Sequence, residues 1–188
     1  SRDGSSRMGV QIFDVEGDKE YDLSGLQRGY TYTALFLPYD EIGCAGNVKR
    51  VEFTVPNGEL AGNPQIKVDF SNITQTGYTA TLTPNGDVSG YFFLNIETDD
   101  PTLDQMMQMM RVPDLKHYIV QFGADFNTHK PHEGVQESVM TEFKPGTSYT
   151  VYVVLIDKDG QYSDVQKFTV TTQKKGTSAT AHVSIEVK

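Results

Sequence analysis

Two stretches of this chain carry the same pattern: Leu23-Ser-Gly-Leu26-Gln-Arg-Gly29-Tyr-Thr-Tyr32-Thr33 and Met140-Thr-Glu-Phe143-Lys-Pro-Gly146-Thr-Ser-Tyr149-Thr150. The second stretch follows the first by 117 residues, and the same offset relates Asp40 and Gly43 to Asp157 and Gly160. Further on, Glu52-Phe53-Thr-Val55 matches Lys167-Phe168-Thr-Val170 at an offset of 115 residues. Self-similarity at a long, fixed spacing predicts a tandem array of domains.

Each copy reads as a β-hairpin. The runs 31–37 and 147–156 are rich in β-branched and aromatic residues, and each is followed by a turn and a shorter strand that ends in Phe-Thr-Val. In the second copy the turn is Asp157-Lys-Asp-Gly160, whose Asp and Gly suit turn positions. The first copy has a longer connection, from Asp40 to Asn47.

Between the copies lie segments that occur once. Alternating or continuous apolar residues predict strands at 65–70, 77–83 and 90–96, and the region 117–126 is expected to form a further strand. A helix is predicted near 100–112, because Asp100-Pro101 suits a helix start and Leu103, Met106, Met107 and Met110 share one face. The segment 127–134 is expected to be a polar loop.

The domain organisation follows from these elements. We expect 1–56 to be the C-terminal part of one sandwich domain and 63–173 to be a complete domain. Residues 177–188 would form the first strand of a further domain or complete another sandwich, because His182 to Val187 matches Gln65 to Phe70 at the offset of 117 residues. The partial first domain would leave a sheet face uncovered, so residues ahead of Ser1 or another chain are expected to supply its missing strands.

Composition narrows the function classes. The chain has 188 residues, with ten Tyr, ten Phe and no Trp, which favours an all-β protein. Its formal net charge of −9 argues against nucleic acid or an anionic membrane as partner. Cys44 is the only cysteine, so no internal disulfide can form. No stretch of the sequence offers the roughly 20 apolar residues of a transmembrane helix.

The pattern resembles the fibronectin type III domain, a β-sandwich of the immunoglobulin-like class. The resemblance rests on Phe143 to Val153, on Asp159-Gly160-Gln-Tyr-Ser163, and on Phe168-Thr-Val-Thr-Thr172. It implies that Tyr149, and Tyr32 in the first copy, form a tyrosine corner. The family's core Trp is missing, and Leu82 or Phe93 would take its place. The Met-rich helix is an insertion, similar to those in tandem fibronectin-like units of surface lipoproteins from gut Bacteroidetes.

Several side chains could in principle bind a metal ion or take part in catalysis. His129, His132 and Glu133, with His117, could be written as a metal site, but a Pro-containing loop lacks helical ligand spacing. Asp157 to Gly160 begins like a calcium loop without its later acidic ligand, and Asp99-Asp100 suits helix capping. We therefore expect no catalytic, metal or cofactor-binding residues.

Two groups of side chains suggest contact surfaces. Met106 to Met110 could adapt to a partner, although a helix that simply covers an open edge of the sandwich is the favoured explanation. The tyrosines that could stack on sugars are Tyr39, Tyr91, Tyr118 and Tyr162. About half of the strand aromatics are nevertheless expected to point inward.

These observations predict a non-enzymatic interaction or spacer module of an exported, surface-associated bacterial protein. The partner would be a protein or glycan at the cell surface, and self-association through the incomplete sandwich is a further expectation. Two alternatives remain: an accessory carbohydrate- or substrate-binding module of a secreted enzyme, and a self-associating adhesin segment. The sequence does not identify a ligand.

Overall fold

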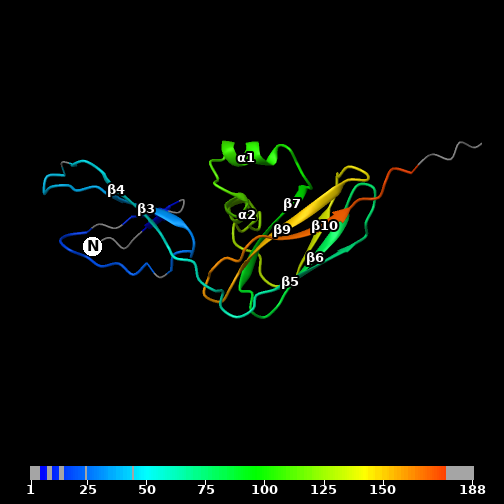
Figure 1. The fold of residues 1–188 in the computed structure, drawn as a ribbon, viewed down its shortest axis with the longest axis horizontal. Coiled ribbons are helices and arrows are strands. Elements are labelled where there is room, and N and C mark those ends of the chain that lie inside the picture. The colour runs from blue at the N-terminus through cyan, green and yellow to red at the C-terminus, as the bar shows by residue number, and fades with distance from the viewer. Residues whose placement is uncertain (1–4, 8–9, 13–14, 24, 44, 177–188) are drawn as a thin grey trace, which may run out of the picture. The chain divides into compact units, whose positions relative to one another are not determined.

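The computed structural model of the chain describes residues 5–7, 10–12, 15–23, 25–43 and 45–176. It separates into two compact units, unit 1 (residues 1–56) and unit 2 (residues 57–188). Nearly all regular structure of the described residues is antiparallel β-strand, with two short helices (Figure 1). The expected all-β class is therefore confirmed. No helix in the described part of the chain is long and apolar enough to span a membrane.

The described residues of unit 1 form two separate strand pairs. The first joins β1 (Ser5–Arg7) to β2 (Val10–Ile12), and the second joins β3 (Thr31–Phe36) to β4 (Lys49–Thr54). The β3–β4 pair is the hairpin that the sequence predicts for the first copy.

Unit 2 is a sandwich of two three-stranded sheets. One sheet has the order β5-β6-β8 and the other β10-β9-β7. The strands are β5 (Ile66–Ser71), β6 (Tyr78–Pro84), β7 (Gly90–Glu97), β8 (Gln136–Met140), β9 (Ser148–Ile156) and β10 (Gln166–Thr171). The main core lies between the sheets and includes Leu82, Tyr91 and Val153.

Strand β9 is buried on both faces. Val151, Val153 and Leu155 point into the main core, whereas Tyr152 and Val154 point to a second core on the outer side of the sheet. A strand covered on both sides needs apolar residues at successive positions rather than at alternate ones. This double burial explains the continuous apolar run that the sequence shows here.

The expected helix near 100–112 is present as α1 (Leu103–Met109). The Asp100 carboxylate stabilises its entry, accepting hydrogen bonds from the backbone N–H and the hydroxyl of Thr102 at 2.8 Å each. None of its residues is buried, and Met109 is 73% exposed. Helix α1 therefore contributes little to the core.

The prediction of a strand at 117–126 is wrong, because this region contains helix α2 (Leu115–Phe122). Asp114 caps the helix by accepting a hydrogen bond from the backbone N–H of His117 at 2.8 Å. Apolar residues at 115, 118, 119 and 122 fit a helical period, and Ile119 is fully buried against β7 and β9. Burial of one helical face thus outweighed the strand propensity of Tyr118, Ile119 and Val120.

Strand β8 was not predicted. It pairs with β6 and completes the β5-β6-β8 sheet, with Tyr78 opposite Met140. Three of its five residues are polar, and its two exposed positions are Glu137 and Val139, with Val139 at 68%. The preceding segment 127–134 has the irregular structure expected of a loop, apart from a single bridge between His132 and Tyr91.

The two hairpins share their backbone pairing at a constant offset of 117 residues. Thr31 pairs with Thr54 and Ser148 with Thr171, and both pairs join their side-chain hydroxyls, at 2.8 and 2.7 Å. The turns match as well, since Gly43 N–H donates to Asp40 O at 3.0 Å and Gly160 N–H to Asp157 O at 3.1 Å.

The alignment of Phe53 with Phe168, at an offset of 115 residues, is therefore wrong in structural terms. Phe53 lies opposite Tyr32, and Val170 lies opposite Tyr149, so Val170 is the counterpart of Phe53. A shift of two residues keeps each side chain on the same face of a strand. The Phe-Thr-Val similarity is thus compatible with either alignment, and only the pairing register decides between them.

Equivalent hairpin positions differ in burial between the units. Phe36 is 55% exposed and its counterpart Val153 is fully buried, because the β5-β6-β8 sheet covers Val153. Tyr39 is 57% exposed, against 9% for its counterpart Ile156. The expected strand within 177–188 lies outside the described residues.

Candidate functional site

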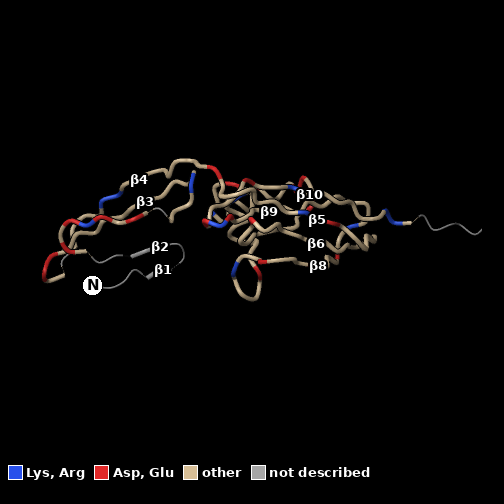
Figure 2. Tube along the Cα trace, turned by 90° about the horizontal axis from the view of Figure 1, so that it is seen from below, with Lys and Arg blue, Asp and Glu red and all other residues tan. Residues whose placement is uncertain are grey.

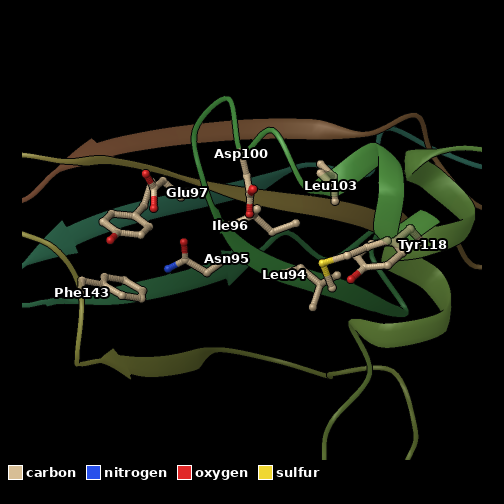
Figure 3. Close-up of a pocket in the computed structure, with 10 residues that line it drawn as sticks. Leu94, Asn95, Ile96, Glu97, Asp100, Leu103, Tyr118 and Phe143 are labelled. Atoms are coloured by element: carbon tan, nitrogen blue, oxygen red, sulfur yellow. The ribbon is translucent and has the colours of Figure 1, made fainter. Parts of the chain in front are cut away.

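A pocket of 340 Å³ in unit 2 is the candidate functional site (Figure 3). It lies along the second half of β7, beside α1, α2 and the turn that precedes β9. Its lining is mainly apolar, with three polar or acidic side chains. The lining residues are Leu94, Asn95, Ile96, Glu97, Asp100, Leu103, Met106, Tyr118, Phe143 and Tyr149.

The pocket lies at the edge of a sheet. Strand β7 is the last strand in the order β10-β9-β7, so among the described residues one of its sides has no neighbouring strand. Side chains from both faces of β7 reach the pocket, since Leu94 and Ile96 belong to the outer face, whereas Asn95 reaches toward β6. In Figure 3 Leu103 and Tyr118 lie on the helical side and Phe143 on the opposite side.

The tyrosine corner fixes the wall opposite the helices. Tyr149 Oη accepts a hydrogen bond from the backbone N–H of Lys144 at 2.9 Å, and its ring stacks on Phe143 with centroids 3.9 Å apart. In unit 1 Tyr32 Oη accepts from the backbone N–H of Gln27, also at 2.9 Å. Both tyrosines therefore make the contact that the resemblance implies, and Tyr149 also shapes the pocket.

Asn95 is the polar residue at the base of the pocket. Its Nδ2 donates a hydrogen bond to the hydroxyl of Tyr78, whose pKa burial raises to about 12, so that the phenol stays protonated at neutral pH. The Asn95 Oδ1 atom is buried and has no hydrogen-bond partner among the described residues. A buried acceptor without a donor is energetically unfavourable, so Asn95 Oδ1 is an unsatisfied polar atom within unit 2.

Two carboxylates lie at the rim. Glu97 accepts from Lys144 Nζ at 2.7 Å, and this hydrogen bond together with the charge of Glu97 raises the pKa of Lys144. Hydrogen bonds from Thr102 hold the pKa of Asp100 below its usual value. The two carboxylates lie near a single ammonium group, that of Lys144, so acidic side chains outnumber basic ones at the rim.

The histidines that the sequence suggested as metal ligands make different contacts in the structure. His117 lies on α2, with Nδ1 at 2.8 Å from Asp114 Oδ1, and His132 packs its ring on Phe93 at 4.6 Å between centroids. His129 and Glu133 are exposed in the loop. Within the described ranges, no group of three or more His, Cys, Asp or Glu side chains is arranged to hold a metal.

The turn at Asp157 has a structural role. The Asp157 carboxylate is fully buried and accepts hydrogen bonds from the backbone N–H groups of Ala61, Asp159 and Gln161, at 2.7, 2.9 and 2.8 Å. Its oxygens therefore bind backbone donors that lie both before β5 and after β9. This arrangement secures the start of unit 2 to its β9 turn.

Most of the tyrosines considered for sugar stacking are not available for it. Tyr91 is fully buried, Tyr118 is 8% exposed, and Tyr162 packs edge-on against Phe92. Tyr39 alone of the four is widely exposed, at 57%. The four side chains do not form the sugar-binding surface that the sequence had suggested.

Sequence reasoning did not select Asn95, Glu97 or Phe143 as site residues. Asn95 interrupts the apolar run from Tyr91 to Ile96, and a polar residue in such a run is the signal that could have found it. No local sequence pattern predicts the pocket itself, because its walls come from four separate segments of the chain.

No protein-family model and no curated protein matches this chain. Solved structures do match it. A computationally redesigned β-sandwich protein has 17% identity over 59% of this chain and 94% of its own length, with a TM-score of 0.34. A two-domain fibronectin type III segment of chicken tenascin has 14% identity over 77% of this chain and 66% of its own, with a TM-score of 0.31.

A family 28 exopolygalacturonase from Yersinia enterocolitica has 15% identity over 59% of this chain, with a TM-score of 0.30, and the match covers 20% of the enzyme. At these identities and TM-scores the similarities assign no activity to this chain. The structure itself defines the structural class of the protein: it is an all-β protein whose unit 2 is a sandwich with a tyrosine corner.

Proposed function

We propose that this chain is a non-catalytic interaction and spacer module of an exported, surface-associated bacterial protein, built from tandem fibronectin type III-like domains. The repeated hairpin carries the proposal. Its pairing, turn and tyrosine corner recur at one constant offset, as expected of units that are duplicated for their shape. Figure 2 shows acidic and basic residues along both units, which fits a protein kept soluble by its charge.

The pocket supports an interaction role. Its lining combines apolar walls with few polar groups, the usual composition of a binding site. The carboxylates at its rim are engaged with Lys144 and Thr102, so neither has the arrangement of a general acid–base pair. Binding rather than reaction is the activity that this geometry suits.

A panel of extracellular proteins and glycans, probed with the labelled chain, tests the proposal. We expect reproducible binding to a protein, with no turnover of any bound molecule. Binding confined to glycans would replace the proposal with the accessory module of a secreted enzyme. A panel that stays blank across both classes would refute the interaction role.

Self-association is a second candidate, favoured by the exposed apolar side chains of the unit 1 hairpin, such as Phe36, Leu37 and Tyr39. Light scattering over a range of concentrations tests it. A mass that rises with concentration, and that falls back when Phe36 is replaced by Lys, would support an adhesin-like assembly. A monomer at every concentration would exclude it.

A further inference from the structure

The free edge of β7 offers unused backbone hydrogen-bonding groups beside the pocket. On this side Tyr91 N–H donates to His132 O at 2.9 Å, His132 N–H donates to Tyr91 O at 2.8 Å, and Phe93 N–H donates to Gly123 O at 3.0 Å. The loop and the end of α2 thus occupy the first half of the edge. They do not reach Asn95, and beyond Asn95 the Glu97 carbonyl oxygen accepts a hydrogen bond from the Asp100 N–H at 3.2 Å.

The same side of β7 carries the backbone groups of Asn95. In an antiparallel pair, successive residues point their N–H and C=O groups alternately toward and away from the partner strand. Since Tyr91 and Phe93 point away from β9, Asn95 does as well, and its backbone has no partner on that side among the described residues. An extended peptide is the ligand that matches such an edge, because its own N–H and C=O groups repeat at the strand spacing.

The pocket adds side-chain recognition to this edge. Asn95 Oδ1 is buried without a donor, directly beside the unpaired backbone. Leu103, Met106 and Phe143 provide apolar walls, and Glu97 and Asp100 provide negative charge in excess of the single Lys144 ammonium. A positively charged side chain with an apolar stem fits both features.

We propose that the second half of β7 binds an extended peptide by strand addition, with a Lys or Arg side chain of that peptide entering the pocket between α1 and Phe143. The peptide backbone pairs with Asn95, and a peptide donor satisfies Asn95 Oδ1. The basic group lies beside Glu97 and Asp100. This inference deepens the proposed interaction function and rests on it.

Helix α1 suits the role of an adaptable wall. Its Met106 lines the pocket and is 36% exposed, and none of the residues of α1 is buried. Met side chains change conformation at low cost, so the wall can adjust to different side chains of the peptide. The buried polar atom and the backbone edge are the fixed parts of the site.

Selection from a random heptapeptide phage library against the immobilised chain 1–188 tests the proposal. The selected peptides are then synthesised, and their affinities are measured by fluorescence anisotropy. We expect sequences in which Lys or Arg stands beside an apolar residue. Asn95→Leu is expected to weaken binding about tenfold, because the ligand's donor loses its acceptor. N-methylation of the peptide amide that pairs with Asn95 is expected to abolish binding.

Two further variants keep the test decisive. Asn95→Leu also removes the partner of the Tyr78 hydroxyl, so its folding is checked by circular dichroism. If it unfolds, the double variant Glu97→Gln with Asp100→Asn, at the rim of the pocket, decides. It is expected to bind the peptides about fivefold more weakly than the parent chain. High salt should reduce this difference, because it weakens binding by the parent chain. Val139→Thr, which replaces an exposed residue of β8 outside the pocket, is the matched control and should bind like the parent.

The outcomes separate this inference from the proposed function. The inference is wrong if no peptide is enriched, if the enriched peptides lack basic residues, or if they bind equally well to the pocket variants. If the pocket variants still bind the extracellular protein found on the panel, the interaction role stands and the β7 site is refuted. If peptides bind as expected but the panel is blank, the β7 site stands and the surface role fails.

Discussion

Replacement of Asp157 by Ala tests how unit 2 is held together. The Asp157 carboxylate is fully buried and accepts three backbone hydrogen bonds. Each hydrogen bond to a charged group contributes about 1.5–3 kcal/mol, but donors near the surface regain water when the carboxylate is removed. Gln161 is buried and regains least. The expected loss in the free energy of unfolding of unit 2 is therefore about 3–5 kcal/mol.

The chain provides its own control for this change. Asp40 occupies the same turn in unit 1 and accepts a hydrogen bond from the Ile42 N–H at 3.1 Å, but its side chain is exposed. For a unit of this size, a loss of 3–5 kcal/mol lowers Tm by roughly 10–20 °C. Replacing Asp40 by Ala should lower the Tm of unit 1 by only about 2–3 °C, as is usual for a surface residue.

The assay combines calorimetry with amide hydrogen exchange. Calorimetry measures the Tm of each unit, and exchange reports whether the amides of Ala61 and Gln161 lose protection in the Asp157→Ala variant. Equal shifts in Tm for the Asp157 and Asp40 variants would refute the reasoning. Unchanged protection at Ala61 would also refute it, because the carboxylate could not then be what secures the start of unit 2.

Three further predictions concern other contacts. In the variant Gly123→Ala, the added Cβ would lie 2.5 Å from Ile119 O and 2.9 Å from Phe93 N, which should detach α2 from β7. Hydrogen exchange of the α2 amides should then become faster, and exchange at the rate of the parent chain would contradict this. Tyr149→Phe should lower the Tm of unit 2 by roughly 4–8 °C, because the Lys144 N–H loses its acceptor. Tyr32→Phe should lower the Tm of unit 1 by less, and calorimetry measures both values. Burial lowers the pKa of His132 below 6.5, so its contribution to stability is complete above pH 6.5 and is lost as the pH falls through the lowered pKa. The urea midpoint of the parent chain should therefore fall more between pH 7.5 and 5 than that of His132→Gln, and parallel curves would count against this.

The sequence predicted the strands well where burial made the pattern strong. The runs at 66–71, 78–84, 90–97 and 148–156 are apolar or alternate clearly, because each contributes to the core. The helix at 103–109 was predicted from its start signal and spacing. The tyrosine corners followed from the resemblance, since a short motif within one segment carries that contact.

The errors arose where local preference and tertiary burial disagree. Residues 118–120 prefer strands individually, yet they form part of α2, since Ile119 packs on the outer face of the sheet. Strand β8 is too polar to be recognised, because only its neighbour β6 makes it a strand. The alignment of Phe53 with Phe168 failed since side-chain faces repeat every two residues and do not fix the register.

The sequence by itself determined the all-β class, the repeated hairpin and the tyrosine corners, because each depends on residues close together in the chain. The tertiary structure alone decided the site. Strand β7, both helices and the turn before β9 meet at the sheet edge only after folding, and this meeting leaves Asn95 Oδ1 buried without a donor. An unpaired edge and an unpartnered atom are properties of the packed chain, so no local pattern encodes them.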